Sequence, residues 1–275
     1  MSTDDSQRSP GDRHEEPSDD ARARDVRLDV DGALILEGRF VVERAISMGV
    51  VPRRIVTTRT TLEKLGELPA ETHVEVLEPD ALSQIAGYNF HRGCLGFADR
   101  PPSGDDLEAR IEAVRAERSA HPILVALDRI TDPVNLGAIF RSCRALGASH
   151  VVMNASCADP WQRRVIRTSM ANIFALRPTV VADLGLALDQ LREGLSATIV
   201  AAHVGASSVD VASYTRPAGP LVLVLGNEGH GISASTLQRC DDAVAIPVRE
   251  ESDSLNVSVA AGILLERLRS TDPID

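Results

Sequence analysis

Unbroken apolar runs recur along the second half of the chain, at residues 123–128, 150–154, 197–204, 221–225 and 243–248. A run without polar alternation is typical of a strand that is buried on both faces of a parallel sheet. Apolar residues at helical spacing lie between these runs and predict helices over 136–147 and 160–173, and a last amphipathic helix over 254–269. This alternation predicts an α/β fold with a mostly parallel sheet and helices on both faces.

A smaller α/β pattern precedes the first of these runs. Strands are expected at 53–58, 72–77 and 93–101, a helix over 79–87, and an earlier helix that ends at Gly49. These elements make a compact unit that is separate from the larger parallel sheet.

Composition shifts along the chain mark the boundaries of these units. Residues 1–27 are polar, charged and poor in large apolar side chains, so we expect a disordered tail. A first domain is expected over 28–101 and a second over 122–275. The Pro-Pro-Ser-Gly run that begins at Pro101 and the helical stretch after it predict a linker helix over 102–121.

Several classes of protein are excluded by composition. No apolar run approaches the roughly 20 residues that span a membrane, and the N-terminus lacks the apolar segment of a secretory signal. Four scattered cysteines without paired spacing are typical of free thiols in the cytoplasm, and they argue against a metal site. The only lysine is Lys64, so the chain has no Walker motif, and no strand is followed by a dinucleotide-binding glycine pattern.

Charge is distributed unevenly, although the net charge is −11. Residues 1–31 hold 10 acidic and 5 basic side chains, a balance of −5, whereas residues 128–178 hold 3 acidic side chains and 7 arginines, a balance of +4. A local basic surface can bind nucleic-acid phosphate whatever the total charge, and a solvated surface is the alternative. The candidate arginines are Arg53, Arg54, Arg92, Arg144, Arg163, Arg164 and Arg167.

The apolar run at 221–225 ends in a loop of unusual composition, Gly226-Asn227-Glu228-Gly229-His230-Gly231. Glycines permit a tight turn and let the backbone approach a ligand closely. Ligands of open α/β sheets bind beyond the carboxyl ends of the strands, which makes this loop a candidate site. An ordinary strand-to-helix turn, capped by Ser233, is the alternative, but a carboxylate such as Glu228 is an unusual choice for packing.

Three separated motifs surround and include this loop: Asp132-Pro133-x-Asn135-x-Gly137-x-x-x-Arg141, Gly226-Asn227-Glu228-Gly229-x-Gly231, and Ile246-Pro247 through Ser254-Leu255-Asn256-Val257-Ser258. In this order they resemble the SpoU/TrmH family of RNA 2′-O-ribose methyltransferases, of the SPOUT class, over residues 122–270. The segments 37–45 and 92–101 resemble the substrate-binding domain, similar to ribosomal protein L30, that some members carry. One segment departs from the family, because residues 248–253 contain Glu250 and no glycine.

The resemblance implies a trefoil knot in the C-terminal domain, an arrangement that ordinary chain topology excludes. It implies S-adenosyl-L-methionine as cofactor, held by backbone at Gly226, Asn227, Ile246 and Leu255, and no metal. It also implies a homodimer formed through the C-terminal domain, whose last helix has apolar residues at Leu255, Val259, Ile263, Leu264 and Leu268. The functional polar residues that it implies are Asn135, Arg141, Glu228, Ser254 and Asn256.

Methyl transfer to a ribose hydroxyl depends on positioning and on removal of the hydroxyl proton. A guanidinium stays protonated in proteins, so we assign Arg141 to a substrate phosphate and to the developing alkoxide rather than to proton removal. The base is then substrate phosphate, water or another side chain. A surface charge at Arg141, a plain helix cap at Ser254 and a buried hydrogen-bonding role at Asn256 are the alternatives.

The domain that resembles L30 favours ribosomal RNA, and in particular 23S rRNA, as the substrate. A transfer RNA methyltransferase is one alternative. A non-catalytic RNA-binding protein with the same fold is another, against which the intact set of polar motif residues argues.

Overall fold

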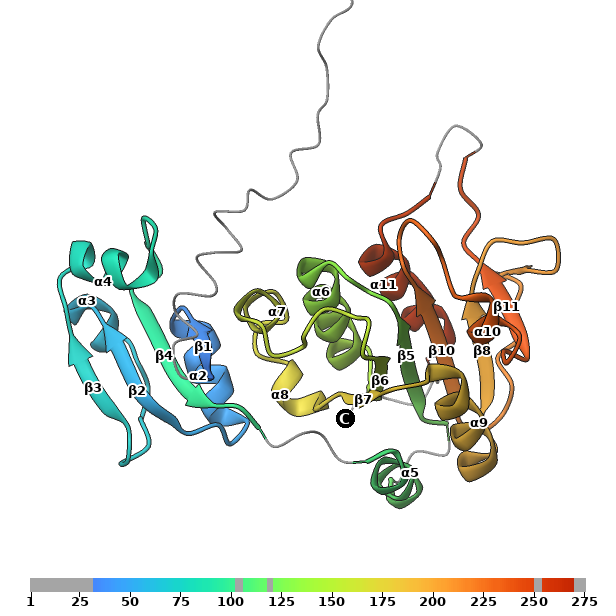
Figure 1. Cartoon of the computed structure of the whole chain (residues 1–275), viewed down its shortest axis with the longest axis horizontal. Coiled ribbons are helices and arrows are strands. Elements are labelled where there is room, and N and C mark those ends of the chain that lie inside the picture. The colour runs from blue at the N-terminus through green and yellow to red at the C-terminus, as the bar shows by residue number, and fades with distance from the viewer. Residues whose placement is uncertain (1–31, 102–105, 118–120, 250–253, 270–275) are drawn as a thin grey trace, which may run out of the picture.

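The computed structural model describes residues 32–101, 106–117, 121–249 and 254–269. These residues form a smaller N-terminal domain and a larger C-terminal domain that lie side by side (Figure 1). The expected tail over 1–27 lies outside the described residues, as do 102–105 of the expected linker. None of the helices within these ranges is long and apolar enough to cross a membrane.

The N-terminal domain is built on a mixed four-stranded sheet of order β1-β4-β2-β3, in which only β2 and β3 are parallel. Its strands are β1 (Ala33–Glu37), β2 (Pro52–Thr57), β3 (His73–Val76) and β4 (Cys94–Asp99). Its helices are α2 (Arg39–Ser47), α3 (Arg59–Leu62) and α4 (Pro79–Ala86).

The predicted strands and the 79–87 helix of this domain are confirmed to within a few residues, but β1 was not predicted. Its five residues are all buried, and only Gly38 separates it from α2. Gly38 has a φ of 95°, a conformation that favours glycine and allows the chain to turn directly from strand to helix. Because only one residue connects β1 to α2, the apolar pattern shows no boundary between the strand and the helix.

The C-terminal domain has a seven-stranded sheet of order β7-β6-β5-β10-β8-β11-β9, and every pair in it is parallel. Its strands are β5 (Ile123–Asp128), β6 (Ala148–Asn154), β7 (Thr179–Val181), β8 (Thr198–Ala202), β9 (Val209–Asp210), β10 (Leu221–Gly226) and β11 (Asp242–Ala245). Its helices are α6 (Pro133–Ala145), α7 (Arg163–Thr168), α8 (Ile173–Leu176), α9 (Leu184–Leu195), α10 (Ala234–Leu237) and α11 (Val257–Leu268), and α5 (Leu107–Ala116) precedes them. The expectation of a mostly parallel sheet is therefore confirmed.

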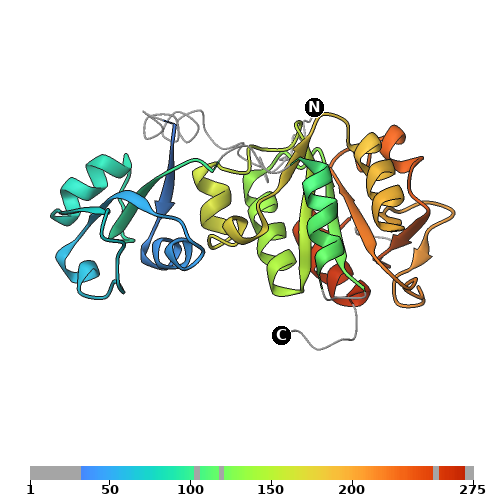
Figure 2. The same cartoon turned by 90° about the horizontal axis from the view of Figure 1, so that it is seen from below.

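The central strands β5 and β10 are buried on both faces, as their unbroken apolar runs predict. Alternate side chains enter two separate cores: Val125 and Leu127 pack with α6, α7, α8 and α11, whereas Leu124 and Ala126 pack with α5 and α9. Figure 1 and Figure 2 show these two helical layers on opposite faces of the sheet. The carboxyl ends of the strands are thus left as the edge where loops gather.

One prediction of local structure needs correction, and three elements of the C-terminal domain were not predicted. The single helix expected over 160–173 is two short helices, α7 and α8, because Met170 and Ala171 adopt left-handed φ angles of 52° and 64° between them. Helix α9 and the short strands β7 and β9 were not predicted. The four cysteines are free, as expected.

Candidate active site

Polar residues from all three motifs meet beyond the carboxyl end of β10. The Asn135 side chain, on α6, donates its amide N–H to the carboxylate of Glu228, in the loop after β10. The Asn256 amide, at the start of α11, donates to Asn135 Oδ1 at 2.9 Å. The structure therefore brings together Asn135, Glu228 and Asn256, which lie far apart in sequence, and we call these three residues the amide–carboxylate cluster.

The beginnings of the two helices hold this cluster in place. Helix α6 begins after Asp132, whose carboxylate accepts from the Val134 N–H at 2.7 Å. Helix α11 begins after Asn256, whose Oδ1 accepts from the Ser258 N–H at 2.9 Å. Asn256 therefore caps its helix with its oxygen and reaches the cluster with its nitrogen. Ser254 is exposed and does not cap α11.

The loop after β10 is a tight hairpin closed by its own backbone. Asn227 N–H donates to Gly231 O at 3.1 Å, and Gly231 N–H donates back to Asn227 O at 2.8 Å. The side-chain oxygen of Asn227 accepts from the N–H groups of Gly229 and His230 at 2.9 and 3.0 Å. A Cβ atom at Gly226 would lie 2.4 Å from the Gly231 carbonyl carbon, so this position excludes any side chain.

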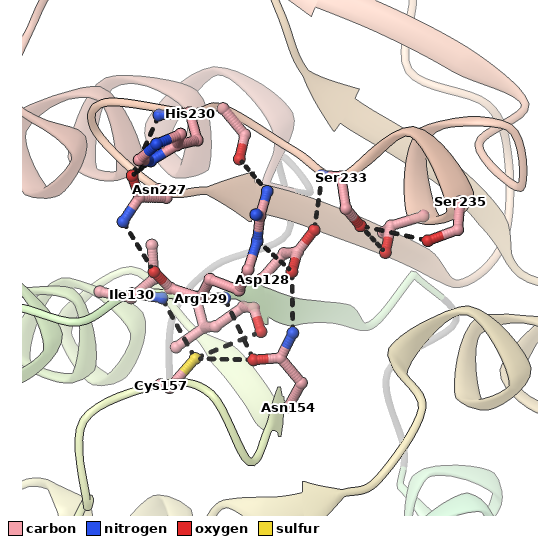
Figure 3. Close-up of polar contacts among 12 residues, drawn as sticks. Asp128, Arg129, Ile130, Asn154, Cys157, Asn227, His230, Ser233 and Ser235 are labelled. Atoms are coloured by element: carbon pink, nitrogen blue, oxygen red, sulfur yellow. Dashed lines mark hydrogen bonds and ion pairs between the residues drawn. The ribbon is translucent and has the colours of Figure 1, made fainter.

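A buried carboxylate that the motifs do not include holds the far end of this loop. Asp128 ends β5 and is 1% exposed. Its oxygens accept from the Ser233 N–H at 2.7 Å and from the Asn154 amide at 2.8 Å (Figure 3). Asp128 thus ties β5, β6 and the loop after β10 together at the sheet edge. The sequence carried a signal for it, since an acidic residue directly follows an apolar run.

Arg129, the next residue, also contacts the loop after β10, at Asn227 and Gly231. Its carbonyl oxygen accepts from the Asn227 side chain at 3.0 Å, and its guanidinium donates to Gly231 O at 3.3 Å (Figure 3). Arg129 has a φ of 60°, which is uncommon for a residue with a side chain. Such conformations persist where surrounding contacts hold them, and here the contacts are those that fix the loop.

Cys157 has a structural role in this region. Its Sγ accepts from the Ile130 N–H at 3.2 Å and supports the loop after β5 (Figure 3). Burial raises the pKa of the Cys157 thiol to about 11, so the thiol is protonated at neutral pH.

Arg141 lies outside the amide–carboxylate cluster. It is exposed on α6, and six residues, about 1.7 turns, separate it from Asn135, so the two side chains leave different sides of the helix. Among the described residues, no side chain forms an ion pair with Arg141. Within the described part of the chain, its guanidinium is therefore open to a ligand.

The residues expected to hold S-adenosylmethionine lie on three segments, which follow β10, follow β11 and precede α11. Gly226 and Asn227 begin the hairpin, Ile246 is half-buried just after β11, and Leu255 is 37% exposed before α11. Backbone from Ile246 to Arg249 belongs to neither strand nor helix, which leaves its polar groups outside the sheet ladder. Glu250 lies outside the described residues.

The predicted RNA-binding arginines are divided between open surface and the protein interior. Arg144 is exposed and Arg164 is half-buried. Arg53 and Arg54 are ion-paired on the N-terminal sheet with Asp99 and Glu75. The side chain of Arg163 is only 6% exposed and contacts Glu37 of the other domain, so its position does not match a surface phosphate contact.

A groove of about 680 Å³ lies beside this site, between the end of the first domain and the segment after β6. Its walls include Arg100, Asn154, Asp159 and Trp161, and none of the amide–carboxylate cluster lines it. The groove is therefore distinct from the place where the three motifs meet.

No group of three metal-ligating side chains occurs within the part of the chain that the structure describes.

Comparison with known proteins agrees with the fold and with the motifs. The model of the SpoU rRNA Methylase family matches residues 122–266. An uncharacterised tRNA/rRNA methyltransferase of Mycobacterium tuberculosis is 31% identical over 241 residues, 86% of this chain and 81% of that protein. The 23S rRNA (guanosine-2′-O-)-methyltransferase RlmB of Acinetobacter baylyi is 28% identical over 228 residues, 78% of this chain and 88% of that protein. The AdoMet-bound rRNA methyltransferase of Sinorhizobium meliloti has a TM-score of 0.72 and 26% identity, over 91% of this chain and 93% of that one.

Fold, motifs and relatives together define an S-adenosylmethionine-dependent RNA 2′-O-ribose methyltransferase. The chain belongs to the SpoU rRNA methylase family, with the family's parallel-sheet domain preceded by a small α/β domain.

Proposed function

We propose that this enzyme methylates a ribose 2′-hydroxyl in 23S ribosomal RNA. The amide–carboxylate cluster carries the proposal, because it joins all three motifs at the sheet edge in one hydrogen-bonded set. Two relatives that are named as 23S rRNA methyltransferases, from Acinetobacter baylyi and Bacillus subtilis, support the choice of RNA. The N-terminal domain, which resembles L30, is proposed to bind the substrate.

S-adenosylmethionine supplies the methyl group when it is bound. In this proposal the backbone at Gly226, Asn227, Ile246 and Leu255 holds the cofactor, and Asp128 and Arg129 keep the hairpin in the shape that binding requires. A rigid loop lowers the cost of ordering on binding.

Arg141 and the amide–carboxylate cluster act on the RNA in this proposal. Arg141 binds the phosphate next to the target ribose and stabilises the alkoxide that develops on the 2′-oxygen. Asn135 and Asn256 orient that ribose with their amide groups, and Glu228 fixes the direction of the Asn135 amide. Ser254 is exposed beside the cofactor segment and contacts the substrate. The hydroxyl proton passes to substrate phosphate, to water or to a side chain other than Arg141, because a guanidinium does not accept it.

We also propose that the protein is a homodimer and that its C-terminal segments form a trefoil knot. Leu255, just before α11, and Val259 and Ile263 on α11 are exposed apolar residues, at 37%, 50% and 36% exposure, and we call them the apolar stripe. Leu264 and Leu268, which were expected on the same surface, are instead buried within the chain at 2% and 1% exposure. The surface proposed for the dimer is therefore narrower than the one expected from the sequence.

The test is methyl transfer from labelled S-adenosylmethionine to transcribed 23S rRNA and, in parallel, to total transfer RNA. Incorporation into 23S rRNA at one 2′-O position supports the proposal. Incorporation only into transfer RNA would identify a transfer RNA methyltransferase. Binding of RNA without binding of S-adenosylmethionine by calorimetry would identify a non-catalytic RNA-binding protein.

A further inference from the structure

A buried carboxylate lies at the boundary between the two domains. Glu37 ends β1 and is 1% exposed. The Tyr88 hydroxyl donates to its Oε1 at 2.5 Å, and Arg163 Nε, from α7 of the other domain, donates to its Oε2 at 3.0 Å. Arg163 also donates to the Tyr88 oxygen at 3.1 Å and lies over the Tyr88 ring. These contacts join the domains through one carboxylate.

Two further arginines reach the same carboxylate. Arg92 Nε lies 3.2 Å from Glu37 Oε1, and Arg167 NH1 lies 3.2 Å from Glu37 Oε2. Three guanidinium groups thus share a single negative charge, which leaves this set with a charge of +2. We call Glu37, Tyr88, Arg92, Arg163 and Arg167 the boundary cluster. A surplus of this size is not needed to neutralise one buried carboxylate.

The three arginines differ in how far they are exposed. The side chain of Arg163 is 6% exposed, that of Arg167 is 29% exposed and that of Arg92 is 54% exposed. The charge of Arg163 is therefore buried with Glu37, whereas the positive charges of Arg92 and Arg167 are accessible at the surface.

The contacts with Glu37 leave further guanidinium donors of Arg92 and Arg167 without a hydrogen bond among the described residues. The closest contact of Arg92 with Glu37 is made by Nε, and neither terminal nitrogen of its guanidinium donates a hydrogen bond within the described part of the chain. Arg167 uses NH1, which leaves NH2 and Nε. A guanidinium whose outer nitrogens are free can bind a phosphate with two parallel hydrogen bonds. Glu37 holds both groups in position, so less side-chain entropy is lost when they bind.

We propose that Arg92 and Arg167, held by Glu37 at the domain boundary, bind a backbone phosphate of the RNA substrate. Arg163 and Tyr88 act as positioning residues that keep Glu37 and the two domains together. The proposal rests on the proposed function in one respect, that the protein binds RNA.

The location of the cluster suits an RNA strand that extends from one domain to the other. Helix α7 packs against β1 of the N-terminal domain on one side and against α6 on the other (Figure 1). Helix α6 carries Asn135 and Arg141, so α7, which carries Arg163 and Arg167 of the boundary cluster, packs directly against the helix of the candidate active site. RNA bound across the boundary therefore passes over elements that are packed directly against that helix.

The test compares Arg92→Gln, Arg167→Gln and their double variant with Arg115→Gln as a matched control. Arg115 lies on α5, has 51% side-chain exposure and pairs with Glu112, so it resembles Arg92 without belonging to the boundary cluster. RNA affinity is measured over a range of salt concentrations with transcribed 23S rRNA and with poly(U) as probes. Melting temperature and calorimetry with S-adenosylmethionine show that each variant is folded and binds its cofactor.

We expect the double variant to bind RNA about tenfold more weakly than the wild type. A plot of the logarithm of the binding constant against the logarithm of the salt concentration should have a slope that is smaller by about 0.7, the value for one phosphate contact on a single strand. Arg115→Gln is expected to match the wild type, and Arg92→Lys to retain part of the affinity because it keeps the charge. Unchanged affinity and salt dependence in the folded double variant, with RNA binding by the wild type intact, would overturn this proposal alone. A wild type that binds neither probe would overturn both this proposal and the proposed function.

Discussion

At the scale of single residues, one carboxylate sets the direction of a series of amide groups. A carboxylate can only accept hydrogen bonds, so the N–H₂ group of Asn135 faces Glu228. The Asn135 oxygen is then turned toward Asn256, whose own oxygen is turned toward the N-terminus of α11. Glu228 therefore fixes the donor and acceptor pattern of the amide–carboxylate cluster.

We expect this dependence to make changes at Asn135 and Glu228 non-additive. Asn135→Ala and Glu228→Ala should each lower the single-turnover rate, and the double variant should be little worse than the more damaging single one. The expected coupling is about 1 kcal/mol or more, as for other residues in direct contact. Single-turnover rates of the four proteins measure it, and strictly additive losses would show that the two residues act independently.

Arg141 provides a separate test of mechanism because it lies apart from that cluster. Arg141→Ala is expected to lower the single-turnover rate about 100-fold, the scale for loss of one transition-state donor. Affinity for S-adenosylmethionine should be nearly unchanged, because the cofactor segments lie elsewhere. Arg141→Lys should restore only part of the rate, since lysine lacks the two-pronged guanidinium. A fully active Arg141→Ala enzyme would remove this residue from the mechanism.

Sequence alone identified the cluster residues but not the groups that support them. Asn135, Glu228 and Asn256 lie in motifs next to strand ends or helix starts, where ligands of α/β proteins bind. Asp128 and Arg129 also follow a strand, but their contacts with the loop after β10 cross about 100 residues of sequence. Such pairings depend on strand order, which periodicity does not reveal.

At the scale of elements, the contact between α6 and α7 depends on a glycine. A Cβ atom at Gly137 would lie 1.8 Å from Thr168 Oγ1 and 2.8 Å from the Val165 carbonyl oxygen. The two helices thus approach more closely than a side chain would permit. Because α7 also packs against β1, this contact links the active-site helix to the N-terminal domain.

Gly137→Ala is therefore expected to destabilise the protein by about 1–3 kcal/mol, the usual range for overpacking. Gly262 on α11 is the matched control, because the nearest atom to its Cβ position is Ser142 Oγ at 3.9 Å. Gly262→Ala should be neutral or stabilising by up to about 1 kcal/mol, since alanine favours a helix. Chemical denaturation of both variants measures the difference. Equal stabilities would show that α6 and α7 can move apart freely.

Strands and helices could be predicted from the sequence where burial alone determines the pattern of apolar residues. The unbroken apolar runs marked the central strands β5 and β10, because both of their faces are buried. The prediction of a single helix over 160–173 was wrong. The left-handed turn at Met170 and Ala171 contains no glycine or proline, so the sequence does not indicate that a helix ends there. The short strands β7 and β9 have exposed residues and no apolar run, so their pairing comes from the sheet rather than from their own sequence.

At the scale of the whole molecule, the sequence predicted two domains but not how they are joined. The apolar core of the C-terminal domain is continuous with residues of the N-terminal domain, including Leu36 and Val42. The boundary cluster lies beside this apolar contact, and Glu37 and Arg163 are 126 residues apart. No local pattern marks such a distant pair.

The boundary cluster predicts a loss of stability in acid. The Glu37 carboxyl is desolvated, which by itself raises its pKa, but Tyr88 and the three arginines outweigh this and hold the pKa below its usual value of 4.5. A lowered pKa stabilises the folded state above the usual value, and this contribution is lost as pH falls through the lowered pKa. Melting temperature should therefore fall below about pH 4.5 more steeply in the wild type than in Glu37→Gln. Parallel curves would show that Glu37 does not contribute.

A dimer through α11 is the last prediction at this scale. Val259 is the most exposed of the three residues in the apolar stripe, at 50%. Val259→Glu should therefore give a monomer, because a buried charge at the interface is costly. Light scattering should give twice the chain mass of 29.5 kDa for the wild type and the chain mass for the variant. A monomeric wild type at micromolar concentration would contradict the dimer.

The spacing of the partners of Glu37 also bears on how the protein is made. Tyr88 and Arg92 belong to the same domain as Glu37, so the carboxylate has two partners before the second domain exists. Arg163 is synthesised 126 residues after Glu37, a delay of roughly 6–25 s at the usual rate of translation. On the ribosome the first domain can therefore fold as a unit with its charge compensated, and docking of the two domains has to wait until α7 has been synthesised.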